Sequence, residues 1–423
     1  MSVHSFVAHF LQENGYQKTL SAFEAEHGNL IATELPHEET LEGIISDRLR
    51  YLSLDGPSKP KFEEILDPQL QDIRKRQFKP WRAPYPKTPR ELGPVKELVV
   101  DSAVLSRNGI LYALLATSSK SLVVVDLAKK KEVSRVPSVI GNVVIRRIVV
   151  AGELVFLCGM NGQVSVGKIS ENLAKFDVLS HTQIHPRLVT DIKVISWRGN
   201  LHLVSLGWDF LVKVFVLNTS DNYTLTPVGD PYKLANQGSC IDTVVYKDKL
   251  YVLVCKRELT LMDVLCMEGD HPNLYLDCRM ALNDAEFSAS GFTPQCVKIF
   301  TQEDGAVPLV AIGTSHEPHM RVIVVSMNGV GQKDGQAVLR HQILCNLNTS
   351  SPQDKFSDAE ISWRYDGSGI WVIGDDGAIR GLDLVSGSVD VHLEGHDGRI
   401  KCVSFYEDRV VSCGTDRKVL AWE

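Results

Sequence analysis

Short runs of alternating apolar and polar residues recur about every 40 to 45 residues from Val95 to the end of the chain, separated by Gly, Asn, Asp and Ser turns. A unit of that length can form several short strands but cannot bury its own apolar faces, so copies must pack side by side. Sheets that repeat in this way around an axis form a β-propeller. We therefore predict an all-β propeller for residues 95–423.

Seven segments in this region share the same centre, which is one strand, a turn containing Gly or Asp, and a second strand. A propeller blade is one sheet of four strands, so each centre marks one blade. The sequence therefore predicts seven blades. The seven segments span residues 113–127, 154–169, 201–217, 250–264, 309–325, 370–384 and 393–422.

The last segment carries the most specific motif. It opens on Gly395-His396, continues through two expected strands, and turns at residues 414–417 into a final strand that ends with Trp422. This pattern resembles the WD repeat. The resemblance implies a hydrogen-bonded chain in which an Asp holds a His and a Trp ring packs on the inner strands. The four residues are His396, Ser412, Asp416 and Trp422.

The other segments match the WD repeat only in part, because Gly-His and the terminal Trp occur together in the last one alone. Asp209 in the third segment, and Asp375 or Asp376 in the sixth, are partial matches. Aromatic residues within strand patterns are expected to pack in the core rather than to bind a ligand. The tryptophans of this kind are Trp197, Trp208, Trp363 and Trp371.

The end of the chain sets a requirement for closing the ring. Residues 418–422 form only the third strand of the last blade, so its fourth strand must come from elsewhere. The resemblance to WD-repeat propellers implies a strand from the N-terminal side. Residues 95–104 are expected to provide it, because a β-forming run follows Pro94.

Before the propeller the pattern is helical. Residues 3–11 place apolar side chains on one stripe, Asn14-Gly15 allows a break, and residues 17–27 resume the helical spacing before Gly28. A hairpin of about thirty residues cannot bury enough apolar surface alone. Its stripe is therefore expected to pack on a second copy or, alternatively, on the rest of the protein.

Within this hairpin, assigned to residues 2–28, the run FLQENGYQKTLSAFEAE at 10–26 resembles the lissencephaly-homology (LisH) motif. Its aromatic-Leu, Gly-Tyr, Thr, Phe and Glu residues follow the family's order, while Leu20 stands where the family usually has Ala. The resemblance implies a homodimer. The residues expected at the dimer seam are Val7, Phe10, Leu11, Tyr16, Leu20 and Phe23.

Two stretches join the hairpin to the propeller. Residues 29–78 form an additional helical region, with helices expected at 38–54 and 62–78. Residues 40–52 are weakly similar to the CTLH region that often follows LisH. Residues 79–94 form a basic, Pro-rich linker, because repeated proline excludes regular helix and central strand.

A basic cluster spans the end of the helical region and the start of the linker. It would serve either as a nuclear-import signal or as a patch for an acidic partner. The alternative is a solvated, extended linker laid along the propeller. The cluster contains Arg74, Lys75, Arg76 and Lys79.

Composition argues against several classes of protein. Hydrophobic residues make up 44% of the chain without a run of about eighteen apolar residues that could span a bilayer. The first residues lack the basic start and apolar run of a secretory signal. A net charge of −7 argues against direct nucleic-acid binding through overall potential. We expect an intracellular protein, in the cytoplasm, the nucleus or both, without membrane attachment.

Motifs for catalysis or metal binding are missing from the sequence. None of the 9 cysteines has Cys-x-x-Cys spacing, so buried, reduced thiols are expected. The pairs His181/His185 and His316/His319 lack an evident third metal ligand. No Walker, Gly-x-Ser-x-Gly or His-Glu-x-x-His sequence occurs. We predict no enzyme activity, no cofactor and no metal.

The predicted architecture favours a non-enzymatic scaffold. Propeller loops suit a peptide or the face of another domain, and dimerisation makes such binding bivalent. We therefore expect a homodimer that binds protein partners on its propellers and assembles a complex. Two alternatives stay open: a substrate-receptor or assembly subunit of a ubiquitin-ligase complex, and a chromatin corepressor subunit that binds histone tails.

Overall fold

The computed structural model describes residues 3–28, 31, 40, 41, 45, 66–82, 84–93, 95, 97–170, 176–269, 271–283, 291–302, 305–332 and 337–423. The chain forms two compact units. One contains Met1–Ile65 and Asn283–Ser290, and the other contains Leu66–Leu282 and Gly291–Glu423.

The first unit contains the helical hairpin, formed by α1 (Val3–Glu13) and α2 (Gln17–His27). The chain reverses at Gly15, whose φ of 72° lies in the left-handed region that glycine adopts without strain. At the other end Gly28 caps α2, and its N–H donates to the Glu24 carbonyl at 3.0 Å. The predicted pair of helices is confirmed. The helix expected at 38–54 and the CTLH-like region lie largely outside the described residues.

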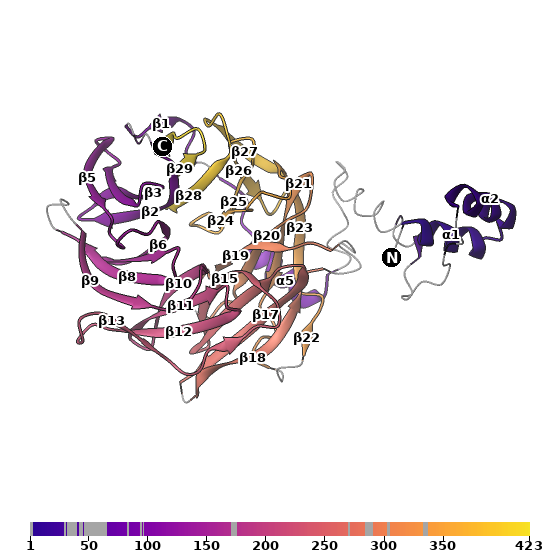
Figure 1. The fold of residues 1–423 in the computed structure, drawn as a ribbon, viewed down its shortest axis with the longest axis horizontal. Helices are drawn as coiled ribbons and strands as arrows, with labels where there is room; N and C mark the ends of the chain where they lie inside the picture. Colours follow the sequence, from indigo (N-terminus) through magenta and orange to yellow (C-terminus); the bar gives the residue numbers. More distant parts are fainter. Residues whose placement is uncertain are drawn as a thin grey trace. The chain divides into compact units, whose positions relative to one another are not determined.

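In its described residues the second unit contains seven β-sheets arranged in a ring, each forming one blade (Figure 1). Blade 1 contains β2 (Val99–Arg107), β3 (Ile110–Thr117), β4 (Ser121–Asp126) and β5 (Lys131–Pro137). Blade 2 contains β6 (Ile145–Ala151), β7 (Leu154–Gly159), β8 (Gln163–Ile169) and β9 (Phe176–Gln183). Blade 3 contains β10 (Val189–Trp197), β11 (Asn200–Gly207), β12 (Leu211–Asn218), β13 (Thr224–Pro227) and β14 (Tyr232–Lys233).

The remaining blades follow the same meander. Blade 4 contains β15 (Gly238–Tyr246), β16 (Lys249–Lys256), β17 (Leu259–Glu268) and β18 (His271–Ala281), with β22 (Val338–Leu339) added in parallel. Blade 5 contains β19 (Pro294–Phe300), β20 (Leu309–Thr314), β21 (His319–Ser326) and β23 (Ile343–Pro352). Blade 6 contains β24 (Ile361–Trp363), β25 (Gly369–Ile373), β26 (Ala378–Asp383) and β27 (Val389–Glu394). Blade 7 contains β28 (Ile400–Tyr406), β29 (Arg409–Gly414), β30 (Val419–Trp422) and β1 (Pro89–Glu91).

Seven blades confirm the predicted fold class. The first six predicted segments lie on the second and third strands of blades 1 to 6, which are buried on both faces by the neighbouring blades. All 6 residues of β4 and all 6 of β7 are buried, whereas the outer strand β5 is exposed or half-exposed. Apolar runs without alternation are typical of strands covered on both faces. The core is therefore divided among the blade-to-blade interfaces.

An N-terminal strand closes the ring, as predicted, but the prediction that residues 95–104 form this strand is wrong. Residues 99–107 pair with β3 and form the innermost strand of blade 1. The fourth strand of blade 7 is β1, which pairs antiparallel with β30 through Pro89 opposite Trp422 and Glu91 opposite Leu420. Three residues suffice because the outer edge of a sheet tolerates proline and needs few ladder bonds. The density of prolines had concealed this strand.

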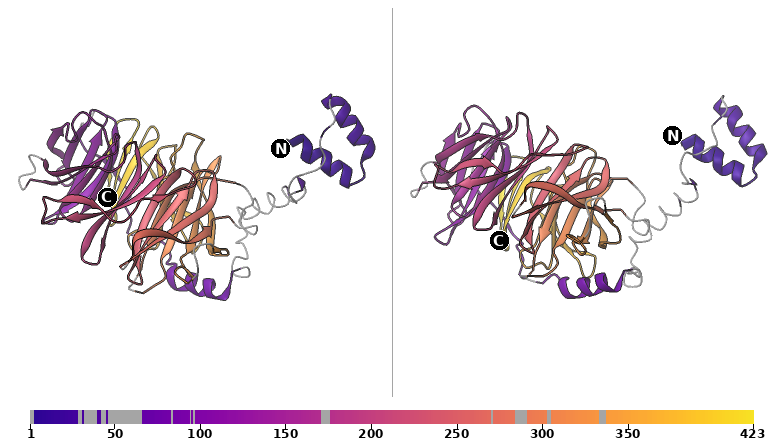
Figure 2. Two further views of the ribbon diagram at one scale, coloured as in Figure 1. Left: turned by 60° about the horizontal axis from the view of Figure 1, so that its bottom comes forward. Right: turned by 90° about the horizontal axis from the view of Figure 1, so that it is seen from below.

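Residues 66–95, which we call the strap, cross blades 5, 6 and 7. The strap begins with α5 (Pro68–Gln77), where Asp67 caps the first turn by accepting the Gln69 N–H at 2.8 Å. Figure 2 shows α5 along one face of the ring. The Gln77 side chain donates to the Val307 carbonyl of blade 5 at 3.0 Å, and Leu92 is buried between blades 7 and 1.

Trp81 fixes the middle of the strap on blade 6. Its backbone N–H donates to Asp383 at 2.7 Å, and its ring meets the Trp371 ring edge-on, with centroids 4.7 Å apart. A Cβ at Gly369 would lie 2.2 Å from the Trp81 ring, so only glycine permits this approach. The start of the expected linker is therefore a packed part of the propeller.

The two faces of the ring differ. Strands alternate in direction, so turns between the first and second strands and between the third and fourth lie on one face. We call it the strap face, because Val307 and Arg364, which bind the strap, lie in such turns. The turns between second and third strands and the connections between blades lie on the opposite face, which we call the connection face.

We predict that the strap is required for a closed ring. A chain that starts at residue 66 keeps α5, Trp81 and β1, while one that starts at residue 93 exposes the β30 edge and the surface under Trp81. Each large buried side chain lost is worth about 2–5 kcal/mol. The shorter chain should therefore aggregate or melt at least about 10 °C lower. Equal melting temperatures in calorimetry would show that the ring closes without the strap.

Candidate interaction site

A hydrogen-bonded chain organises the connection face at blade 7. His396 lies in the connection before this blade, with Nδ1 3.1 Å from both carboxylate oxygens of Asp416 and Nε2 2.8 Å from the Ser412 hydroxyl. Trp422 Nε1 donates to the same hydroxyl at 2.8 Å. Because a carboxylate only accepts, Nδ1 carries the imidazole proton and Ser412 donates to Nε2. The structure thus joins all four residues that the WD-repeat resemblance singles out.

Blade 3 contains a second chain of this kind, which the sequence analysis missed. Nδ1 of His185 lies 2.9 Å from both carboxylate oxygens of Asp209, and its Nε2 lies 2.9 Å from the Ser205 hydroxyl. Phe215 stands at the register position of Trp422, since each pairs with the residue two positions before the serine. The matching spacing from Ser205 to Asp209 and from Ser412 to Asp416 could have revealed it.

Each hydrogen-bonded chain of side chains has a glycine beside it, whose missing Cβ leaves room for the aspartate. A Cβ at Gly207 would lie 2.3 Å from both Asp209 and His185, and one at Gly414 would lie 2.3 Å from Asp416. Burial lowers the pKa of the His185 and His396 imidazoles, and the hydrogen bonds that these imidazoles donate to the aspartates oppose this shift. The buried imidazoles are therefore neutral near pH 7.

The other histidines and aspartates considered at the sequence level have separate partners. His181 pairs with the Ser165 hydroxyl at 2.6 Å, and His316 with Thr314 at 2.7 Å. In blade 6, Asp376 forms an ion pair with Arg380 rather than with a histidine. In the residues that the structure describes, no cluster of three or more His, Cys, Asp or Glu could hold a metal ion.

Exposed apolar residues lie next to the hydrogen-bonded residues of blade 3. Trp208 and Phe210 flank Asp209 in the turn between β11 and β12, and their side chains are 44% and 38% exposed. Met160, in the corresponding turn of blade 2, is 43% exposed. The expectation that Trp208 packs in the core is wrong, because Trp208 lies in the turn rather than in a strand; Trp197, Trp363 and Trp371 are buried.

The connection between these two turns adds exposed Pro186 and Arg187. We call the resulting surface the turn patch. Its residues are Met160, Pro186, Arg187, Trp208 and Phe210.

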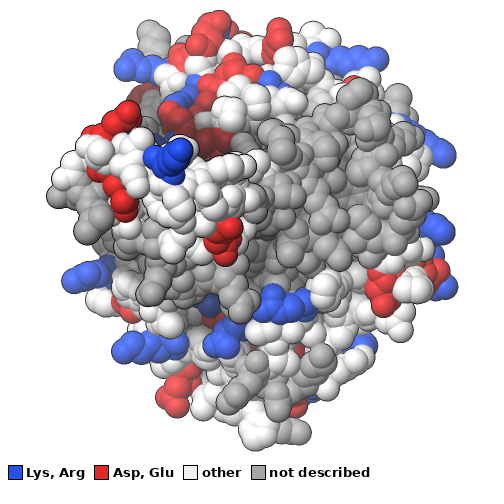
Figure 3. All heavy atoms as spheres, turned by 90° about the vertical axis from the view of Figure 1, so that its right-hand side faces the viewer, with Lys and Arg blue, Asp and Glu red and all other residues white. Residues whose placement is uncertain are grey.

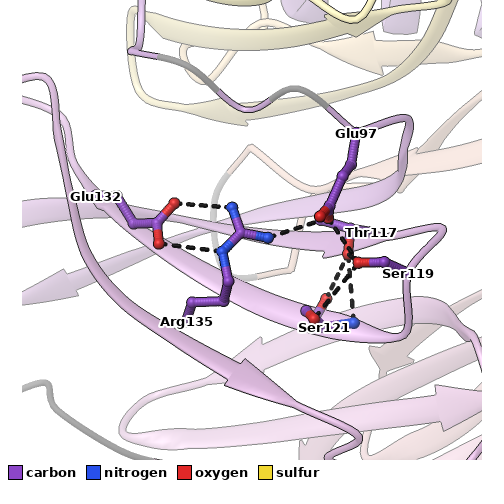
Figure 4. A network of polar contacts seen from close by, with 6 residues as sticks. All are labelled: Glu97, Thr117, Ser119, Ser121, Glu132 and Arg135. Atoms are coloured by element: carbon purple, nitrogen blue, oxygen red, sulfur yellow. Dashed lines mark hydrogen bonds and ion pairs between the residues drawn. The ribbon is translucent and has the colours of Figure 1, made fainter.

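A polar network fastens the connection face at blade 1 (Figure 4). Arg135 donates to both carboxylate oxygens of Glu132, at 3.1 and 2.9 Å, and to Glu97 at 3.0 Å. The Ser119 hydroxyl donates to Glu97 at 2.6 Å, and this hydrogen bond is the main cause that lowers the pKa of Glu97. Glu97 lies between β1 and β2, so the network ties the ring-closing segment to blade 1.

Charged residues on the innermost strands also bind blades together. Asp101 accepts the Ile148 N–H at 2.7 Å, and Asp242 accepts the Ile299 N–H at 2.7 Å, each from the next blade. Burial acts to lower the pKa of Arg147, but Asp101 and further carboxylates outweigh it and raise the pKa. These groups neutralise one another and hold the ring rather than forming an acid–base pair.

The cysteines all lie in the propeller unit. All nine are free, and eight are buried. Burial raises the pKa of Cys158 to about 12 and that of Cys296 to about 11. These thiols are therefore protonated near neutral pH.

The hairpin presents the residues expected at a dimer seam. Leu20 is buried within the pair of helices, and the Phe10 ring lies 6.3 Å from that of Tyr16, which is 53% exposed. The remaining seam residues, Val7, Phe10, Leu11 and Phe23, are half-buried.

Arg74, Lys75 and Arg76 of the basic cluster occupy the last turn of α5, where cations interact favourably with the helix dipole, and Lys79 follows the helix. Arg74 lies over the Phe78 ring, and Arg76 pairs with Asp72 at 2.9 Å. Lys75 and Lys79 are exposed. Figure 3 shows Lys and Arg interspersed with Asp and Glu on the face that it displays. A role of the cluster in nuclear import stays a prediction.

Comparisons with known proteins agree with this architecture. A protein-family model described as "UCP007778, beta-propeller domain" matches residues 61–423. The chain belongs to the UCP007778 family. The model "UCP007778, LisH domain" matches residues 1–32, which confirms the resemblance of the hairpin to LisH.

This UCP007778 protein is similar to the uncharacterized protein YGR117C of Saccharomyces cerevisiae. The two are 25% identical over 459 residues, which cover 97% of this chain and 94% of the yeast protein. Neither family description names a catalytic activity. Among the described residues of the UCP007778 protein, no helix has the length and apolar character needed to cross a membrane.

We predict that both aspartates stabilise the propeller. Asp209→Ala or Asp416→Ala leaves a buried imidazole N–H without its acceptor, at a cost of about 1–3 kcal/mol. Asp248→Asn is the matched control, because it removes a surface ion pair with Arg198, worth at most about 1 kcal/mol, and asparagine tolerates the left-handed backbone at this position (φ 62°). Urea unfolding would measure all three changes. Equal effects at Asp209 and Asp248 would contradict the structural role of the chain in blade 3.

A pH dependence follows from the buried imidazoles. Their pKa is lowered in the folded protein, so below about pH 6.5 the unfolded chain binds more protons than the folded chain does. The free energy of unfolding therefore decreases as the pH decreases. Unfolding free energies measured between about pH 7 and pH 5 should show this decline. The double variant His185→Gln/His396→Gln should be less stable at pH 7 but lose less stability on acidification. An unchanged slope would mean that these imidazoles are not the titrating groups.

Proposed function

We propose that the protein is a non-enzymatic scaffold, in which LisH-type helices join two copies and each propeller binds a protein partner on its connection face. The observation that carries this proposal is the turn patch, whose exposed apolar side chains stand in turns fixed by buried hydrogen bonds. Rigid aromatic residues at a surface are typical anchors of protein interfaces. Two joined copies would turn weak binding into bivalent binding, with gains on the order of 10² to 10⁴.

The hairpin supports the dimer part of the proposal. Phe10, Leu11 and Phe23 stay half-buried within the pair of helices, so the pair leaves part of its apolar stripe accessible. Two helices of this length gain little stability alone, and a second copy would cover the stripe. A homodimer would therefore bury the apolar side chains that the LisH resemblance places at the dimer seam.

We predict that Leu11→Asp yields a monomer, because an unpaired carboxylate at the seam would be desolvated at a cost of several kcal/mol. Gln12→Asp is the matched control, since Gln12 is the exposed neighbour on the same helix. Sedimentation of the full chain at micromolar concentration would compare the two. A monomeric wild type, or a Leu11→Asp variant that stays dimeric, would contradict the proposed seam.

Partner binding is tested separately, by affinity purification and mass spectrometry of the full chain. Recovery of a defined complex, reduced in the Leu11→Asp monomer, is the expected result. Ubiquitin-ligase components or chromatin proteins in that complex would assign the scaffold to one of these two settings. Failure to recover any protein with the wild type would contradict the scaffold function.

A further inference from the structure

The turn patch lies on two neighbouring blades whose turns are hydrogen-bonded to one shared connection. The Ile184 N–H donates to the Gly162 carbonyl at 3.0 Å, which joins the connection to the turn of blade 2. The Trp208 N–H donates to the Leu188 carbonyl at 2.9 Å, which joins the same connection to the turn of blade 3. The backbone segments that carry the turn patch are therefore held relative to one another.

Among the described turns between second and third strands, large exposed apolar side chains lie in blades 2 and 3. Phe356, which is 76% exposed on the same face, lies in the connection between blades 5 and 6. Met160 and Trp208 occupy the same position in corresponding turns. In the turns of blades 1, 6 and 7 this position holds Ser118, Asp375 and Thr415. An exposed apolar pair confined to adjacent turns indicates an interaction site rather than a need of the fold, because the other turns form with polar residues.

Phe210 points to the same conclusion. Its φ is 65°, in the region where a side chain is strained, and the corresponding residue of blade 6 is Gly377 with φ 78°. The Phe210 ring is also more than one-third exposed, so its burial recovers only part of that strain. Lys120 and Arg417 adopt the same conformation at the corresponding positions of blades 1 and 7, so the positive φ belongs to the turn. The feature particular to blade 3 is the exposed aromatic ring at this position.

The charge of the patch defines what it can bind. Asp209 beside the patch is already engaged by His185 and by the Leu211 N–H. Arg187 is exposed and has no ion-pair partner within the described part of the chain. The unsatisfied charge is therefore positive, and it stands beside two aromatic rings. A carboxylate next to a large apolar side chain complements this arrangement.

We propose that the turn patch binds an extended peptide of a partner protein, in which a bulky apolar residue adjoins an Asp or Glu. The apolar side chain packs between Trp208, Phe210 and Met160, and the carboxylate pairs with Arg187. The hydrogen bonds of His185 with Asp209 and Ser205 fix the turn of blade 3, and the Ile184–Gly162 hydrogen bond holds the turn of blade 2. Little conformational entropy of the backbone is therefore lost there on association. This inference rests on the proposed scaffold function and names the partner chemistry of its site.

The test uses the full chain and a displayed library of random linear peptides. Peptides enriched on the wild type should share a large apolar residue beside an acidic one. Phe210→Gly removes the ring and suits the left-handed backbone, so its melting temperature should equal or exceed that of wild type. Arg417→Gly is the matched control, because Arg417 has the same φ of 65° in the corresponding turn of blade 7.

Phe210→Gly should weaken binding of the enriched peptides at least about tenfold, while Arg417→Gly leaves it unchanged. Replacing the peptide's acidic residue by its amide should weaken binding to wild type but not to Arg187→Glu, as in a double-mutant cycle. Enriched peptides without an acidic residue, or with equal affinity for Phe210→Gly, would overturn the proposal, as would a failure of the library to enrich.

Purification of cellular partners with wild type and with each variant tests this proposal separately from the scaffold function. Partners that wild type and Phe210→Gly recover equally would leave the scaffold standing and overturn the turn patch as its site. Partners lost from Phe210→Gly but retained by Arg417→Gly would support both.

Discussion

Closure of the ring depends on three ladder positions between β1 and β30. Each blade of a propeller buries its faces against its neighbours, so an open ring would expose the faces of two blades and the edge of β30. The strap supplies β1 and also buries Trp81 on blade 6 and Leu92 between blades 7 and 1. The segment that closes the ring thus also covers apolar surface on the blades beside the closure.

A closed ring explains why the turns of the connection face can be rigid. Strands packed on both faces cannot shift without opening two interfaces, so the turns that join them are held at both ends. In blades 3 and 7 a buried His–Asp pair adds a fixed link between the turn and the preceding connection. The turn of blade 3 can therefore hold Phe210 in a strained backbone conformation that an isolated loop would relax.

The sequence was informative where one local pattern determines one local structure. Apolar centres with a turn between them identify seven blades, because strands covered on both faces require continuous apolar residues. The helix expected at 62–78 is present as α5 (Pro68–Gln77), but β1 gave no strand pattern because it is short and contains Pro89. Their positions depend on distant partners such as Val307, Asp383 and Leu420, which spacing alone does not reveal.

The candidate site was missed for a related reason. His185 lies farther from Asp209 than His396 does from Asp416 along the chain, and Phe215 replaces the tryptophan that marks the motif. The exposure of Trp208 was equally hidden, because a turn flanked by two apolar strands reads as one strand pattern.

The contrast between the two faces favours the connection face for binding. On the strap face, α5, Trp81 and β1 already occupy parts of blades 5 to 7. The exposed apolar residues Ile110, in blade 1, and Tyr365 and Val385, in two different turns of blade 6, are isolated in the sequence. Single exposed apolar residues are ordinary on protein surfaces, whereas adjoining ones held by a common hydrogen-bond network are not. The turn patch has this second property: the turn around Asp209 supplies both of its aromatic rings, and the connection through His185 joins that turn to blade 2.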